Sequence, residues 1–232
     1  MLGAGDTRTR PRHPLWVRAA HWINAAAFLA LAVSGTAILL ALPRLFWGET
    51  GANDAPAWIV LPLPVDLERT GWGRNLHFVS AWVFVITGGL YGLASLLGGR
   101  LYRRLLPDRD QWHPRHLADE VRGHLGLSAS DEAASGRRYN ALQKLAYLAV
   151  IVVLAPTMLL SGLTMSPGVT SAYPELFTLF GGRQSARTIH FLSAVLLVGF
   201  LVIHVWQVLA HHPVRLMRGM ITGRSAPWGE EA

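Results

Sequence analysis

Four long apolar stretches constrain the fold of this chain more than any other feature. Each is long enough to cross about 30 Å of hydrocarbon as a helix, and helices satisfy their own backbone hydrogen bonds there. Of the 232 residues, 51% are hydrophobic and 15% charged. The sequence therefore predicts an all-α integral membrane protein, a single domain over residues 1–232 with four transmembrane helices. The predicted spans are residues 17–41, 76–97, 142–165 and 189–210.

The positive charge is unevenly distributed between the connections. The formal net charge is +7, but only five of the 21 lysines and arginines lie in the first and third connections, namely Arg44, Arg69, Arg74, Arg183 and Arg187. By the positive-inside rule, both termini are predicted to be cytoplasmic. The basic balance thus reports topology, and we expect no nucleic-acid partner.

Two of the connections between spans are long. The predicted outer connection, residues 42–75, places Trp47, Trp58 and Trp72 among prolines and apolar residues. This composition is typical of a segment along the membrane interface, although a docking surface is an alternative. The predicted cytoplasmic connection, residues 98–141, is expected to be partly helical, and we assign it no chemistry.

Four histidines within or beside the spans are the candidate functional residues. His190 and His204 are fourteen residues apart, which leaves both on one helix face, roughly 21 Å apart. With the predicted topology, His21 and His204 share the cytoplasmic side, whereas His77 and His190 share the outer side. Ionisable residues inside spans usually mark function. Two facing imidazoles suit a haem iron, so the sequence predicts two haems inside the bundle.

Other metal chemistry fits the sequence less well. Zinc or copper would normally need further ligands at each depth, and the absence of cysteine excludes protein-ligated iron–sulfur clusters and covalent haem in this chain. Taken singly, however, each histidine is also explained as an interfacial residue bonded to a carbonyl or water. The matching depths of four histidines favour ligation.

An arginine precedes three of these histidines by three residues. Arg18, Arg74 and Arg187 would each lie one helical turn nearer the membrane surface than their histidine. Arginine pairs well with carboxylates, so these residues are candidates for binding haem propionates. Ordinary snorkelling is the alternative explanation.

The chain resembles the membrane cytochrome b subunits of the formate dehydrogenase gamma, thiosulfate reductase and nickel–iron hydrogenase families, within a wider cytochrome b561-like group. The matching stretches are His21-Trp22, Arg138-Tyr139-Asn140 through Gln143-Lys144, Ser161-Gly162-Leu163, and Arg183 through His190 to His204. The resemblance covers nearly the whole bundle. It implies a prokaryotic inner-membrane protein with two haems b, exchanging electrons between ubiquinone or menaquinone and an oxidoreductase outside the membrane.

The resemblance also implies a quinone site beside the cytoplasmic haem. Asn140 is its main candidate residue, with Tyr139, Gln143 and Lys144 as further candidates. A quinone headgroup needs hydrogen-bond donors and a route for protons, but these polar residues would equally cap and anchor the third span. Leu142 replaces a glycine of the formate dehydrogenase subunits.

The predicted function is transmembrane electron transfer with a periplasmic partner of the molybdopterin type, the chain acting as the electron-transfer subunit. Formate dehydrogenase and hydrogenase complexes remain alternatives for the partner. A second hypothesis is a stand-alone b561-type enzyme that passes electrons from superoxide or another small donor to quinone. A third is a haem-free transporter or scaffold. The third would favour carboxylates in the spans, and the four stretches contain none.

Overall fold

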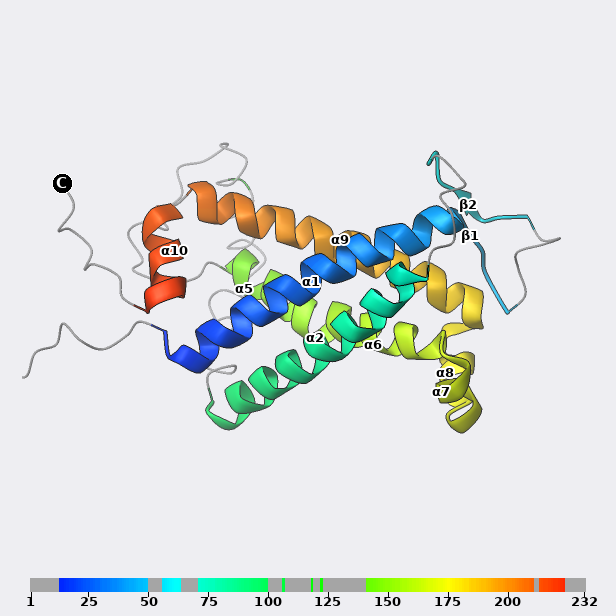
Figure 1. Ribbon diagram of the computed structural model, residues 1–232, viewed down its shortest axis with the longest axis horizontal. Helices are drawn as coiled ribbons and strands as arrows, with labels where there is room; N and C mark the ends of the chain where they lie inside the picture. Colours follow the sequence, from blue (N-terminus) through cyan, green and yellow to red (C-terminus); the bar gives the residue numbers. More distant parts are fainter. Residues whose placement is uncertain are drawn as a thin grey trace, which may run out of the picture. The chain divides into compact units, whose positions relative to one another are not determined.

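The computed structural model describes residues 13–49, 56–63, 71–99, 106, 118, 122, 141–210 and 213–223. In this part of the chain, four helical stretches are long and apolar enough to cross a membrane. They are α1 (Leu15–Ala41), α2 (Trp72–Leu97), Leu142–Thr164 and α9 (Arg183–Ala210) (Figure 1). The prediction of a four-helix, all-α membrane protein is confirmed.

Three of the helices begin before the predicted spans. α1 begins at Leu15, α2 at Trp72 and α9 at Arg183, whereas the apolar runs begin at residues 17, 76 and 189. The helical hydrogen bonds continue through the polar residues that flank each apolar run. Arg74 and Arg187 therefore lie inside the helices that carry His77 and His190.

The third span is a helix of mixed type. It consists of α5 (Ala141–Leu148), a π-helical turn η4 (Ala149–Leu154) and α6 (Ala155–Thr164). The backbone N–H of Ala155 donates to the carbonyl of Val150, five residues earlier. Pro156 follows, and because proline has no N–H it removes one helical hydrogen bond. The wide turn just before it lets the span continue without a break.

The chain divides into two compact units. In the first unit, α1 packs against α2 through small residues: a Cβ built on Gly73 would lie 3.2 Å from Cβ of Ala37. Aromatic contacts also join these helices, with Phe28 and Phe84 ring centroids 6.3 Å apart. The same unit contains the end of α9 from Val198 onward and the short helix α10 (Pro213–Thr222), which turns away from the end of α9 (Figure 1).

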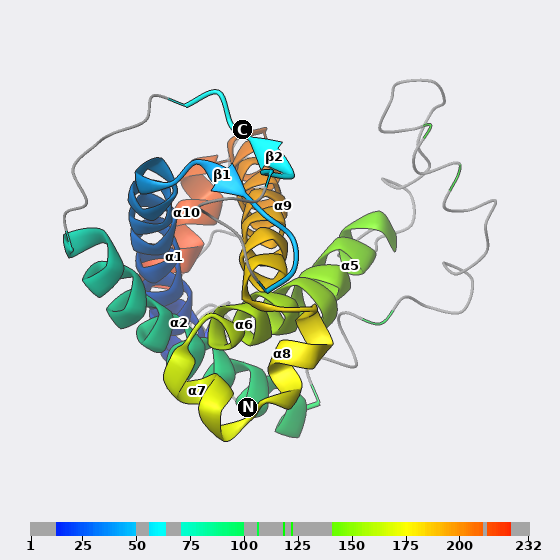
Figure 2. The same cartoon turned by 90° about the vertical axis from the view of Figure 1, so that its right-hand side faces the viewer.

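The second unit contains the third span, the beginning of α9 and the connections around them. Strands β1 (Arg44–Leu45) and β2 (Ile59–Val60) pair antiparallel, with Leu45 opposite Ile59. Two short helices, α7 (Pro167–Ala172) and α8 (Glu175–Phe180), connect α6 to α9 (Figure 2). Gly182, between α8 and α9, has φ of 107°, and any Cβ there would lie 2.5 Å from the carbonyl oxygen of Gly48. Only glycine fits this approach.

The segment after β1 packs onto the first turns of α9. Leu45 and Phe46 are buried, and the buried hydroxyl of Thr188 donates to the carbonyl of Phe46 at 2.7 Å. The backbone N–H of Gly48 donates to Oγ of Ser185, also at 2.7 Å. This part of the predicted outer connection is therefore tied to α9 by its backbone, and its place along the membrane interface stays a prediction.

Tryptophans of the predicted outer connection remain accessible. Trp47 and Trp58 are each 57% exposed, and their ring centroids are 5.5 Å apart. Apart from Gly98, Gly99 and three single residues, the predicted cytoplasmic connection lies outside the described residues, up to the start of α5.

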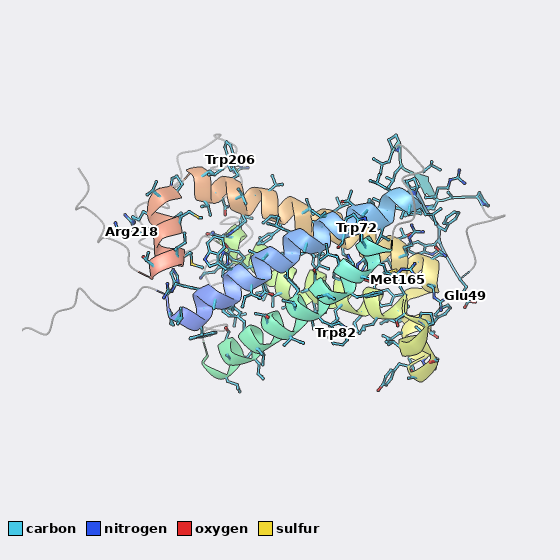
Figure 3. The ribbon with its side chains drawn as sticks, viewed as in Figure 1. Glu49, Trp72, Trp82, Met165, Trp206 and Arg218 are labelled. Carbon is cyan, nitrogen blue, oxygen red and sulfur yellow. The ribbon has the colours of Figure 1, made fainter. Side chains whose placement is uncertain are left out.

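Large apolar side chains are exposed along all four spans. On α2, Trp82 is 64% exposed, and on α9 Trp206 is 70% exposed (Figure 3). Water would disfavour an apolar surface of this extent. A lipid bilayer covers it at no such cost, as expected for a multi-pass membrane protein.

Candidate functional site: four histidines on three helices

His21 of α1 and His204 of α9 lie close together in the first unit, with their rings edge-on. Their ring centroids are 6.4 Å apart and their planes meet at 61°. A bond from a metal to an imidazole nitrogen is about 2.0–2.1 Å long, so two imidazoles on opposite sides of one ion have centroids roughly 6 Å apart. The spacing therefore fits a pair of axial ligands to one haem iron, and the structure brings together these two predicted residues.

One aromatic ring packs beside each histidine of this pair. Trp22 meets His21 edge-on, with centroids 5.3 Å apart, and Phe200 stacks on His204 at 6.3 Å and 15°. Among the described residues, no hydrogen bond to either imidazole is found. Within the described part of the chain, the contacts to these two side chains are thus ring contacts.

His77 of α2 is held by α1. Its Nδ1 atom lies 3.0 Å from Oγ of Ser34, and the backbone of Leu31 accepts a further hydrogen bond from the ring. A Cβ built on Gly35 would lie 3.5 Å from Cε1 of His77. The edge of the imidazole thus rests against a serine and a glycine of the neighbouring helix.

His190 of α9 is held by α6 in the same way. Its Nδ1 lies 3.2 Å from Oγ of Ser161 and 3.1 Å from the carbonyl oxygen of Met158. A Cβ built on Gly162 would lie 3.3 Å from Cε1 of His190. A carbonyl oxygen only accepts hydrogen bonds, so Nδ1 of His190 carries the proton. In the neutral imidazole, Nε2 is then the unprotonated nitrogen, the one that can bind a metal.

The pairing of His77 with His190 remains a prediction. His77 belongs to the first compact unit and His190 to the second, and each is described only with its own neighbours. Among the described residues, no group of three or more His, Asp or Glu side chains gathers as a metal site.

The three arginines lie on the same helices as their histidines. Arg18 donates to the carbonyl of Ile221 in α10, and its Nε is buried without a partner among the described residues. Arg74 is exposed, whereas Arg187 is half-buried. Contact of these side chains with propionates stays a prediction. The orphaned Nε of Arg18 is compatible with it.

Trp22 ties α10 to the turn that carries His21. Its indole N–H donates to the carbonyl of Met220 at 3.1 Å, next to the carbonyl that Arg18 engages. The C-terminal helix is thus hydrogen-bonded to α1 within one turn of a candidate ligand.

The predicted quinone residues are described only in part. Asn140 and Tyr139 lie outside the described residues. The amide of Gln143 donates to the hydroxyl of Tyr147 at 3.5 Å, and Lys144 is buried at 8% exposure. The quinone role of these residues stays a prediction.

Ser34 and Ser161, which hold the two histidines, were missed as functional residues. The sequence does contain a short repeated pattern, in which Ser-Gly follows three apolar residues. It occurs as Leu31-Ala-Val-Ser34-Gly35 in α1 and as Met158-Leu-Leu-Ser161-Gly162 in α6. Serine and glycine are so common at helix contacts in membranes that this match carries little weight until the structure places a histidine against each.

Comparisons with known proteins show the family to which the chain belongs. Residues 12–223 match the model of a family described as prokaryotic cytochrome b561. A protein of Azospira oryzae named as a protein-methionine-sulfoxide reductase subunit, YedZ1, is 30% identical over 199 residues, which cover 84% of this chain and 89% of that protein. Proteins named as Ni/Fe-hydrogenase B-type cytochrome subunits are similar too. That of Cupriavidus necator is 27% identical, covering 83% of this chain and 76% of its own length, and that of Azotobacter vinelandii is 28% identical, covering 88% and 84%. No solved structure matches the chain.

Proposed function

This chain belongs to the prokaryotic cytochrome b561 family, and we propose that it carries electrons through two haems b between the quinone pool and a periplasmic oxidoreductase. At the coarser level, it is a b561-type cytochrome of membrane electron transfer, a multi-pass protein of the inner membrane. Cytochromes of this family bind haem b. The number of haems, the quinone and the type of partner are the proposed parts.

The single observation that carries the proposal is the close pair His21 and His204. Two imidazoles with centroids 6.4 Å apart, on helices that cross a membrane, have the spacing of axial ligands to one iron. His77 and His190, each with Nδ1 engaged by a neighbouring helix, are proposed to hold the second haem. A bound haem supplies one-electron oxidation and reduction.

The remaining residues have supporting roles in this proposal. The guanidinium groups of Arg18, Arg74 and Arg187 would bind propionates, since arginine matches carboxylates in charge and geometry. Asn140, with Tyr139, Gln143 and Lys144, would hydrogen-bond the quinone carbonyls and exchange protons with water. The positive-inside distribution supports cytoplasmic termini, which puts the quinone residues and the pair His21 and His204 on that side.

For the partner, we propose a molybdopterin-type oxidoreductase in the periplasm. Support comes from the likeness to thiosulfate-reductase-type cytochromes and from the Azospira relative, which is named as a subunit of a reductase. The hydrogenase-associated relatives support a nickel–iron hydrogenase instead. The proposed path of electrons within this chain is the same for either partner.

Quinol reduction of the purified protein tests the proposal. We expect reduced ubiquinone or menaquinone analogues to reduce the haem b of the protein in lipid vesicles. His21→Ala should lose this reduction, because it removes the haem beside the quinone. The matched variant His77→Ala should keep it. A protein whose haem is reduced by dithionite but by neither quinol would contradict the proposal, as would equal quinol reduction in the two variants.

A further inference from the structure

The same small motif contacts both histidines of the predicted outer pair. Ser34 and Gly35 of α1 meet His77, and Ser161 and Gly162 of α6 meet His190. In each motif, a residue three positions before the serine, Leu31 or Met158, supplies a backbone acceptor to the same imidazole. Two unrelated pairs of helices thus surround their histidines with the same groups at the same spacing.

The hydroxyl protons of both serines are already used. Ser34 donates to the carbonyl of Ala30 at 2.6 Å, and Ser161 donates to the carbonyl of Met158 at 3.2 Å. A hydroxyl has one proton and two lone pairs, so the oxygen that faces each imidazole acts there as an acceptor. The ring nitrogen Nδ1 must then be the donor. Both serines are fully buried, which keeps water from competing for this bond.

The glycines let the imidazole edge come close. The Cβ of an alanine would lie 3.5 Å from Cε1 of His77 at position 35, and 3.3 Å from Cε1 of His190 at position 162. With no side chain there, the Nδ1 edge of each ring can sit against the helix backbone. With Nδ1 protonated, Nε2 of each neutral ring is the unprotonated nitrogen, the one that can bind a metal.

We propose that Ser34 and Ser161 are positioning residues, which hold His77 and His190 as Nδ1–H tautomers and so leave Nε2 of each as the nitrogen that can bind haem iron. The inference rests on the proposed ligation by these histidines. A histidine ligand that donates its other N–H is a more basic ligand. Basic ligands and their hydrogen bonds are among the levers that set haem potentials. The paired serines therefore lower the potential of this haem relative to the same site without them.

Removal of the hydroxyls tests the proposal. In Ser34→Ala and Ser161→Ala, a redox titration should show a higher midpoint potential for one haem, with a larger rise in the double variant. Haem affinity should fall by about tenfold, the lower end for loss of such a supporting bond, because the backbone acceptors remain. Serine-to-threonine variants, which keep the hydroxyl, should restore the lower potential.

Each variant has a matched control on its own helix. The hydroxyl of Thr36 in α1 donates to Ala32, and that of Thr164 in α6 donates to Leu160, both at 2.8 Å and both within their own helix. Thr36→Ala and Thr164→Ala should leave both midpoint potentials unchanged. If the serine variants shift the potentials no more than these controls, the proposal is wrong.

A second measurement needs neither a variant that folds nor a bound haem. In the haem-free protein labelled with ¹⁵N-histidine, the resonances of His77 and His190 should show a protonated Nδ1 and an unprotonated Nε2. The opposite tautomer would overturn the positioning role even if haem binds. Conversely, a wild-type protein that binds no haem would refute the proposed function, while the tautomers would still decide the role of the serines.

Discussion

The four candidate ligands fall into two differently built environments. Serine, glycine and a backbone acceptor of a neighbouring helix hold His77 and His190 through Nδ1. In contrast, the rings of His21 and His204 lie edge-on to each other, with Trp22 beside His21 and Phe200 beside His204. No hydrogen bond to either ring is found among the described residues. The contacts of the first environment determine which nitrogen of His77 and His190 carries the proton before a cofactor binds. The described contacts of the second determine how far apart the rings of His21 and His204 lie.

This difference indicates how the two predicted haem sites would be tuned. Hydrogen bonds to ligands change their basicity and so the potential of the iron. Ring contacts such as those of Trp22 and Phe200 supply no hydrogen bond of this kind. We therefore expect the site of His77 and His190 to have the lower potential of the two, other factors being equal.

The largest expected effect comes from removing single ligands. His21→Ala and His204→Ala should each abolish the same haem, and His77→Ala and His190→Ala should each abolish the other. The haem content of each variant should fall from two per chain to one, as measured by pyridine haemochrome analysis with redox titration. If His21→Ala and His77→Ala removed the same redox component, the two environments would belong to one site and the comparison would fail.

The next largest effect is expected from a methyl group at Gly162. A Cβ at 3.3 Å from the His190 ring is closer than an ordinary contact, so Gly162→Ala should displace the ring and lower haem affinity at that site by about tenfold. At Gly35 the corresponding distance is 3.5 Å, an ordinary contact, and Gly35→Ala should change the affinity little. Both variants gain similar helix propensity, so haem titration of the two isolates the ring contact. Equal affinities would contradict the importance of this approach.

A smaller effect is expected where the segment after β1 meets α9. Thr188→Val leaves the carbonyl of Phe46 without its donor in a buried position. The loss should be about 1–3 kcal/mol of stability, seen as a lower thermal unfolding temperature in detergent. Thr36→Val, at an exposed position on α1, is the control and should cost little. Haem content should stay at the wild-type value in both, since neither threonine holds a histidine. A stability loss no larger than the control's would show that this bond does not anchor the segment.

The smallest effect concerns the end of α10. Trp22→Phe keeps an aromatic ring beside His21 but removes the indole N–H that donates to Met220. We expect a loss of about 0.5 kcal/mol of stability, since the residue is partly exposed, and faster proteolysis at the C-terminal helix. The potential of the haem held by His77 and His190 should not change. A change there would show that the two environments are coupled.

The spans and the candidate ligands were predictable because each leaves a strong trace in the sequence. Twenty or more apolar residues must form a helix in lipid, and a histidine in such a run stands out. That His21 and His204 share one side of the membrane was predicted from the direction of the spans. In contrast, the π-helical turn at residues 149–154, the packing of residues 43–49 onto α9, and the serine contacts depend on neighbours distant in sequence. Nothing in the local pattern around Ser34 distinguishes a serine that also accepts from a histidine from one that only donates to the carbonyl of Ala30.

The haem content of the purified protein tests the central claim most directly. A reduced-minus-oxidised spectrum with pyridine haemochrome quantification should give two haems b per chain, matching the two pairs of histidines. A protein purified intact from haem-replete cells with no haem would contradict the account. In that case the four imidazoles would be ordinary polar residues of the helix contacts.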